Sequence, residues 1–294
     1  MQSVEPIEPI EPVESVEILE EQLTDPVEGV RCAPATGSRA AVLVLSGSSG
    51  RVETDRCRLL ARAGLTALSI RWFGGPGQPA GICEIPLETF TRAIDRLHAD
   101  GAERISVLGT SKGAEAALLL ALREPRLAAV VALAPTDLVW ANVGPGADGV
   151  TAPYRSSWTW QGSPLPFVPY DDSWQRAEPE GAPVAYRSHY QRSRRTFAEA
   201  AGRAVIPIER TDAELLLVAG ADDEMWPALD HARALAARAR KATLISHDRA
   251  GHRIRLPGEA PLPPSPLNRH GGTPEADAEL GARAWPEVLR LLRG

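Results

Sequence analysis

The stretch RISVLGTSKGAEAALLLAL, residues 104–122, places a Gly-x-Ser-x-Gly motif between a short apolar run and a longer one. The short run has the length of a buried strand, and the longer one has the length of a helix. Gly109 and Gly113 allow a sharp turn and close neighbours, so that Ser111 projects above a sheet. The helix N-terminus directs its N–H groups and partial positive charge toward the same serine. The stretch therefore predicts an exposed nucleophile at a strand-to-helix turn.

Strands and helices alternate on both sides of this motif. We expect helices at 53–63, 86–99, 112–123, 227–240 and 275–292, and strands at 16–23, 30–33, 41–45, 66–70, 105–108, 128–134, 215–219 and 242–246. The alternation predicts an α/β fold with a mostly parallel central sheet, helices on both faces and an antiparallel edge formed by the earliest strands. Such a sheet binds ligands at the carboxyl ends of its strands.

Composition excludes several classes of function. The chain has 294 residues and a formal net charge of −6, so it lacks the basic field that would draw it to nucleic acid or an anionic membrane. It has no apolar run of the roughly 20 residues that a membrane-spanning helix needs, and its N-terminus is acidic. Its three cysteines lack Cys-x-x-Cys spacing, which favours reduced thiols over disulfides or zinc. We expect a cytoplasmic protein without metal or cofactor.

Two regions depart from the alternation. Residues 1–15 repeat Glu-Pro-Ile/Val, which predicts a disordered acidic tail ahead of one domain at 16–294. A Pro/Gly-rich insertion at about 138–207 holds ten of the fifteen aromatic residues. These rings form either the core of an inserted cap or the wall of a substrate pocket that excludes water. The candidates for the pocket are Trp158, Trp160, Phe167 and Tyr170.

A serine nucleophile needs a base, and the base needs a carboxylate that orients it. Asp222 and Asp223 follow one later strand, and His252 lies in the loop after the next strand. Of the two acids we favour Asp223, which lies four residues before Pro227. His252 is favoured by its Ala-Gly-His context over two competitors, His247 and His189. The order Ser, Asp, His is the one expected for an α/β-hydrolase fold.

The site also needs N–H donors for a tetrahedral oxyanion. The backbone N–H of Lys112 follows from its position after the nucleophile. A second donor is expected from Ser48 or Ser49, in the small-residue loop after the strand at 41–45. That loop lacks the glycine spacing of phosphate-binding motifs, so nucleotide binding is not favoured. We expect the Lys112 side chain to be a solvated charge.

From about residue 40 to 292 the chain resembles the C-terminal catalytic domain of the acyl-CoA thioesterase / bile acid-CoA:amino acid N-acyltransferase family, within reach of dienelactone hydrolases. The matching segments are GSSG (47–50), IRWFG (70–74), IPLETF (85–90), GTSKGAE (109–115), SSWTWQGSPLPFVPY (156–170), IPIER (206–210), GADDEMWP (220–227) and AGH (250–252). The resemblance implies Ser111, Asp223 and His252 as a triad that transfers an acyl group from a thioester.

The chain departs from this family in two respects. Eukaryotic members carry an immunoglobulin-like β-sandwich before the catalytic domain, and the roughly 40 residues here are too few for a sandwich of about 100. The transferases of the family use a cysteine nucleophile where this chain has Ser111. We therefore expect hydrolysis rather than amidation.

Three functions follow, in order of preference. The first is a serine hydrolase of a thioester or ester, most similar to an acyl-CoA thioesterase. The second is an acyltransferase or cyclase that passes the acyl group to an amine or hydroxyl of a natural-product-type substrate. The third is a non-catalytic binding protein on the same scaffold. The substrate is a small molecule, linked to coenzyme A or a carrier protein in one version of the hypothesis, and candidate phosphate partners are Arg187, Arg192, Arg194 and Arg195.

Overall fold

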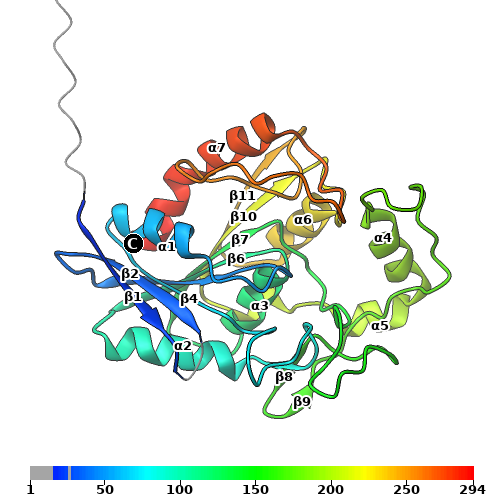
Figure 1. The fold of residues 1–294 in the computed structure, drawn as a ribbon, viewed down its shortest axis with the longest axis horizontal. Coiled ribbons are helices and arrows are strands. Elements are labelled where there is room, and N and C mark those ends of the chain that lie inside the picture. The colour runs from blue at the N-terminus through cyan, green and yellow to red at the C-terminus, as the bar shows by residue number, and fades with distance from the viewer. Residues whose placement is uncertain (1–15, 26–27) are drawn as a thin grey trace, which may run out of the picture.

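A computed structural model describes residues 16–25 and 28–294, so the expected acidic tail at 1–15 lies outside the described residues. The centre is an eight-stranded sheet in the order β1-β2-β4-β3-β6-β7-β10-β11 (Figure 1). Its strands are β1 Ile18–Leu23, β2 Gly29–Pro34, β3 Ala40–Leu45, β4 Thr66–Ile70, β6 Arg104–Thr110, β7 Leu127–Leu133, β10 Glu214–Gly220 and β11 Ala242–His247. All eight strands expected from the sequence are present.

Strand direction follows the hydrophobic pattern. Within the eight-stranded sheet, the neighbours β4, β3, β6, β7, β10 and β11 pair in parallel in that order. Strand β2 is antiparallel to both β1 and β4. The apolar runs of β3, β6, β7 and β10 are buried almost throughout, as parallel strands covered on both faces must be. The exposed pattern of β1 suits an edge strand. The structure confirms the expected α/β-hydrolase fold.

Helices cover both faces of the sheet. They are α1 Thr54–Arg62, α2 Glu88–Ala99, α3 Lys112–Ala121, α6 Ala228–Arg238 and α7 Pro274–Arg293. Helices α1 and α7 pack on one face, and α2, α3 and α6 pack on the other (Figure 1). The expected helix at 86–99 begins two residues late because β5, Ile85–Pro86, pairs with β8. Among the described residues no helix has the length and apolar character that a bilayer crossing requires.

The segment between β7 and β10 contains the insertion expected at about 138–207. Two short strands, β8 Trp158–Trp160 and β9 Ser163–Pro164, form a small second sheet with β5. Helices α4 Arg187–Thr196 and α5 Ala198–Arg203 and the 3₁₀ turn η1 Ile208–Arg210 follow. In Figure 1 α4 stands apart from the sheet, beyond the N-terminal end of α6. This segment therefore lies beside the carboxyl ends of the central strands.

The turn from β6 to α3 depends on two glycines. A Cβ added at Gly109 would overlap the carbonyl of Gly113, and a Cβ at Gly113 would overlap the Ser46 carbonyl at the end of β3. Both obstacles are backbone atoms that cannot rotate away. The close approach of β3, β6 and α3 therefore excludes any side chain at these two positions.

We predict that Gly113→Ala destabilises the protein strongly, because the added methyl group forces backbone shifts that typically cost about 1–3 kcal/mol or more. Chemical denaturation would measure the free energy of unfolding. The control is Gly202→Ala in α5, where an added Cβ meets no atom within 4 Å. This control should be neutral or slightly stabilising, and equal effects at both positions would contradict the packing argument.

Candidate active site

Ser111 lies at the turn between β6 and α3 in a backbone conformation that a residue with a side chain rarely adopts. Its φ is 56° and its ψ is −119°. The strain, of order 1–3 kcal/mol for such a residue, is held by neighbours: Ser111 N donates to Leu133 O at 2.9 Å, and Ser111 O accepts from Ala114 N and Glu115 N. The hydroxyl has no hydrogen bond to another described residue. The fold thus presents Ser111 Oγ without a local partner.

Asp223 and His252 meet across the loops that follow β10 and β11. His252 Nδ1 lies 2.6 Å from Asp223 Oδ2. A carboxylate only accepts hydrogen bonds, so Nδ1 carries the proton and Nε2 is left to accept one. Asp223 is fully buried, and its Oδ1 accepts from the N–H groups of Met225 at 2.8 Å and Trp226 at 3.2 Å. These donors fix the carboxylate, which in turn fixes the imidazole ring.

The competing residues have other partners. Asp222 is exposed, and its Oδ2 accepts from Gly272 N at 3.0 Å. His247 pairs with Glu279 on α7 at 3.1 Å. His189 lies in α4 with its Nε2 3.2 Å from Asp171 O and its ring stacked on Trp174. The structure therefore brings Asp223 and His252 together and places the three alternatives elsewhere.

Backbone contacts hold the two loops against each other. Asp222 N donates to Ala250 O at 3.0 Å, and His252 N donates to His270 O at 2.9 Å. A Cβ at Gly220 would overlap the Ala250 carbonyl, which shows how closely the loops approach. The indole of Trp226 packs edge-on against the His252 ring, with centroids 5.7 Å apart. The pair is therefore held by rigid backbone rather than by side chains alone.

Asp277, in the first turns of α7, is a site-adjacent residue that the sequence did not reveal. It is buried, and its Oδ1 accepts from Gly251 N at 2.7 Å, next to His252. Burial, together with the nearby Asp223 charge, raises the pKa of Asp277 to about 6. The helix begins here because Pro274 occupies its first turn and the Thr273 side chain accepts from Ala276 N. In the sequence, the Thr-Pro pair indicates where α7 begins. It does not indicate that Asp277 contacts the histidine loop, the loop after β11 that holds His252.

The two segments that carry the predicted oxyanion donors adjoin Ser111. Lys112 is the first residue of α3, where an N–H has no partner within the helix. The loop after β3 lies against the nucleophile, since a Cβ added at Gly47 would lie 3.2 Å from Ser111 Cβ and 3.8 Å from its Oγ. Ser48 and Ser49 follow directly and are exposed. Either serine remains the predicted second donor.

The expectation of a solvated Lys112 side chain is wrong. This side chain is 2% exposed and pairs at 2.6 Å with Glu115, which is 0% exposed. Its ammonium also lies 5.5 Å from the centroid of the Trp158 ring. Burial lowers the pKa of Lys112, against the opposing effect of Glu115. The prediction failed because only the three-dimensional packing of the insertion over α3 removes Lys112 from solvent.

Glu115 connects α3 to the insertion. Its Oε1 accepts from Trp140 N at 3.0 Å and from Trp158 Nε1 at 2.8 Å, while its Oε2 binds Lys112. Every one of these contacts is buried. The helix that begins at the nucleophile is therefore joined to the inserted segment by a satisfied polar network.

The four aromatic residues predicted to line a substrate pocket all pack against other parts of the protein. Trp158 is fully buried against Trp72, at a centroid distance of 5.3 Å, so its role here is packing. Trp160 is half-buried under Arg123, and Tyr170 stacks on Trp140. Phe167 is half-buried against the core. None of the four lines either cavity described below.

The four arginines proposed as phosphate partners mostly bind the protein itself. Arg187 donates to the carbonyls of Ala221 and Asp223, at 2.8 and 3.0 Å. Arg192 pairs with Asp171 at 2.8 Å, and Arg194 lies 3.9 Å from Asp137. Arg194 and Arg195 line a small cavity of about 210 Å³ between α4 and α6.

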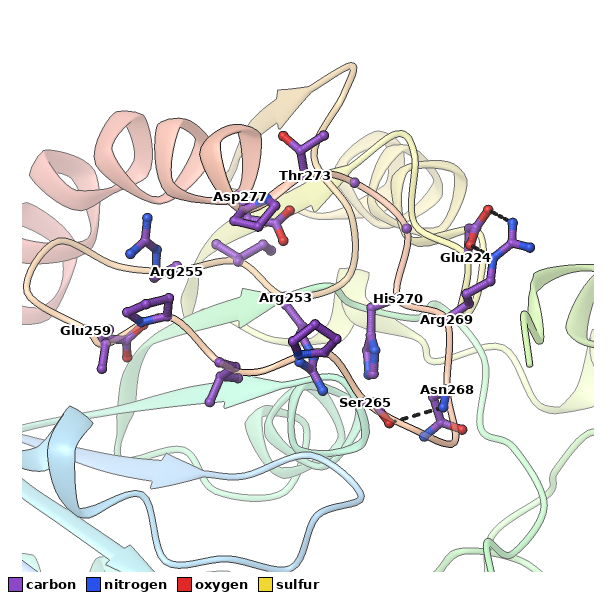
Figure 2. Close-up of a pocket in the computed structure, with 18 of the residues that line it drawn as sticks. Glu224, Arg253, Arg255, Glu259, Ser265, Asn268, Arg269, His270, Thr273 and Asp277 are labelled. Atoms are coloured by element: carbon purple, nitrogen blue, oxygen red, sulfur yellow. Dashed lines mark hydrogen bonds and ion pairs between the residues drawn. The ribbon is translucent and has the colours of Figure 1, made fainter. Parts of the chain in front are cut away.

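A larger cavity of about 770 Å³ adjoins the Asp223–His252 pair (Figure 2). Residues that follow β3, β10 and β11 line it, so it lies at the carboxyl ends of the sheet, where α/β folds bind ligands. His270, one of its lining residues, has its ring centroid 6.0 Å from that of His252. Arg56, another, donates to Thr110 Oγ1 at 2.8 Å, directly before Ser111. The cavity therefore borders the loop that holds His252, and Arg56 connects its wall to Thr110.

No group of three or more His, Cys, Asp or Glu side chains in the described part of the chain could hold a metal ion.

Comparison with known proteins identifies the family of the chain. The family model described as BAAT / Acyl-CoA thioester hydrolase C terminal matches residues 85–293. Mouse acyl-coenzyme A amino acid N-acyltransferase 1 is 25% identical over 275 residues, covering 88% of this chain and 61% of the relative. Mouse acyl-coenzyme A thioesterase 5 is 23% identical over 269 residues, covering 87% and 60%. The chain spans about three fifths of the length of these curated relatives.

Solved structures share the fold. A Klebsiella pneumoniae protein provisionally described as a dienelactone hydrolase superposes with a TM-score of 0.57 at 17% identity, covering 94% of this chain and 98% of that one. An alpha/beta hydrolase fold protein from Nakamurella multipartita gives 0.52 at 17% identity, covering 91% and 95%. At these identities the likeness establishes the α/β-hydrolase fold alone.

The Lys112–Glu115 pair generates a stability prediction. Lys112→Met or Glu115→Gln alone leaves a buried charge without its counterion, which typically costs about 3–5 kcal/mol. The double variant should cost clearly less than the sum of the two, as measured by a double-mutant cycle in chemical denaturant. The matched control is the exposed Arg203–Glu199 pair of α5, whose cycle should give less than about 1 kcal/mol. Additive effects at Lys112 and Glu115 would contradict the coupling.

Asp277 generates a pH prediction. Because its folded pKa of about 6 exceeds the ordinary value of 3.8, the folded state holds the proton more tightly and loses stability as pH rises from about 4 to 6. Asp277→Asn keeps the oxygen that accepts from Gly251 N but cannot ionise. The free energy of unfolding of the variant, relative to wild type, should therefore rise between pH 4 and pH 7, by at most about 3 kcal/mol. A difference that does not vary with pH would disprove this ionisation.

Proposed function

Because this chain belongs to the BAAT / acyl-CoA thioester hydrolase C-terminal family, we propose that it is a serine hydrolase that cleaves a thioester or ester through an acyl-Ser111 intermediate. The observation that carries the proposal is the 2.6 Å contact between His252 and Asp223, in loops at the same sheet edge as the strained Ser111 turn. An α/β-hydrolase site requires these three groups in this chain order.

The reaction steps follow from which nitrogen of His252 carries a proton. Asp223 holds the Nδ1–H of His252, so Nε2 can accept the hydroxyl proton as Ser111 Oγ attacks the carbonyl carbon. The tetrahedral oxyanion accepts hydrogen bonds from Lys112 N–H and from the N–H of Ser48 or Ser49. Collapse breaks the bond to the leaving thiol or alcohol, which takes the proton from His252. Water then attacks the acyl-serine by the same sequence of proton transfers and releases the acid.

The substrate we propose is an acyl thioester of the coenzyme A type. The matched relatives are named as acyl-coenzyme A enzymes, which supports this class. The 770 Å³ cavity beside the histidine loop is within the usual size of small-molecule sites, about 300–1,000 Å³, and gives the leaving group a place to lie.

Acyl transfer to an amine is the second candidate, because one of the matched relatives is named as an amino acid N-acyltransferase. In that reaction the acyl-Ser111 bond would be broken by an amine instead of water. Mass spectrometry of the products, with and without added amines, separates the two. A free acid formed at the same rate in the presence of amines supports hydrolysis.

We expect Ser111→Ala and Asp223→Asn to reduce kcat/KM by about 10⁴-fold or more, since triad members act as a unit. The matched control is Asp222→Asn, because Asp222 neighbours Asp223 in sequence but binds Gly272 N instead of His252. It should retain activity within a few-fold of wild type. A panel of acyl-CoA, aryl-ester and lactone substrates measures the effect. Undiminished turnover in Ser111→Ala, or an equal loss in both Asp variants, would refute the assignment.

A further inference from the structure

The acidic side chains that line the large cavity all have partners in the protein, whereas not every arginine there has an acidic partner among the described residues. Six acidic residues line it, and four of them pair with arginines, while the other two, Asp222 and Asp277, accept backbone N–H groups. The arginine pairs are Glu53 with Arg51, Asp55 with Arg58, Glu224 with Arg269 and Glu259 with Arg56. The acids of the cavity are thus held by the protein and leave some of its cations without a carboxylate.

Arg253 is such a cation, and it follows His252 directly in the chain. Its Nη1 donates to Pro263 O at 2.5 Å, and no carboxylate of the described residues lies within ion-pair distance. Burial and the Arg51 charge lower the pKa of Arg253, and Asp277 acts in the opposite direction. Arg51 pairs with Glu53, whereas Arg253 lines the same cavity without a carboxylate partner among the described residues.

His270 does not supply further positive charge. Burial, the Arg253 charge and the neighbouring His252 lower its pKa to about 4, so it is neutral at neutral pH. Figure 2 shows the Arg253 and His270 side chains extending from the same loop toward the cavity. His270 therefore contributes a neutral ring to the cavity wall, and Arg253 contributes the unpaired positive charge.

We propose that Arg253, with Arg51 beside it, forms a subsite for an anionic oxygen group of the substrate, a phosphate or a carboxylate. The inference rests on the proposed function, because it places the anion relative to a carbonyl at Ser111. An anion here supplies the counterion that Arg253 lacks, and guanidinium groups bind both phosphate and carboxylate in bidentate geometry. Arg253 is thereby a specificity-determining residue for the leaving group or the acyl chain.

The two sources of the anion differ in where the charge lies. A phosphate would belong to the leaving thiol, as in coenzyme A, whereas a carboxylate would lie at the far end of a dicarboxylic acyl group. Acetyl-CoA and acetyl-4′-phosphopantetheine against acetyl-pantetheine test the phosphates with and without the adenosine, and glutaryl-pantetheine against butyryl-pantetheine isolates the carboxylate. All five substrates carry the acyl group on the same pantetheine thiol.

The test compares wild type, Arg253→Met, Arg253→Lys and Arg240→Met. For the substrates that carry the recognised anion, Arg253→Met should raise KM about 10-fold or more with kcat little changed, as expected for loss of a charge-assisted hydrogen bond. Arg253→Lys should recover part of the loss. Arg240→Met, at an exposed arginine that pairs with Asp212 and lines neither cavity, should leave KM unchanged. A thermal melt of each variant establishes that it folds.

Binding separates this proposal from the proposed function. Calorimetric titration of wild type and Arg253→Met with coenzyme A, pantetheine and glutarate requires no turnover. An anion-dependent loss of affinity in Arg253→Met supports the subsite even when no thioester is cleaved, an outcome that would reject the hydrolase proposal alone. Equal affinity of both proteins for every anion, or equal KM changes on charged and neutral substrates, overturns the subsite.

Discussion

The contact between Gly113 and the carbonyl of Ser46 determines how the site can be built. It allows α3 to lie close to the end of β3, and a second close contact, between Gly109 and Gly113, closes the turn. The turn leaves no room for side chains at Gly109 and Gly113, and Ser111 between them adopts a positive φ. The same approach places Gly47, and with it the loop of predicted oxyanion donors, against the serine. One backbone packing constraint thus positions the nucleophile and the donor loop together.

The acid and the base are positioned by the same kind of constraint. Gly220 against Ala250, and Gly271 against Asp222, bring the loops after β10 and β11 close enough for Asp223 to reach His252. Asp277 adds a side-chain acceptor at Gly251 N and so joins α7 to the histidine loop. A site held by strand ends and close backbone contacts is more rigid than one carried by free loops. The open side, by contrast, is the large cavity, where substrate specificity can vary without disturbing the scaffold.

Much of this could be predicted from local sequence. The continuous apolar strands, the order of Ser111, Asp223 and His252 and the Gly-x-Ser-x-Gly turn are local patterns with a physical cause, and the structure has the expected strands and joins the selected acid to the selected histidine. The structure of the insertion was harder to predict, because its short strands and α4 depend on contacts between residues that are distant in the sequence. Lys112 illustrates the limit, because it is buried against Glu115 and against Trp158, which lies 46 positions along the chain. The role proposed for Arg253 likewise could not be predicted from the sequence, because it depends on which arginines the carboxylates of the cavity pair with.

The most direct test of the central claim is covalent labelling with a fluorophosphonate, followed by peptide mass spectrometry. A serine activated by the Asp223–His252 pair should form one adduct, located on Ser111, and the labelling rate should fall sharply in His252→Gln. An unlabelled wild-type protein, or an adduct on another residue that persists in Ser111→Ala, would contradict the account.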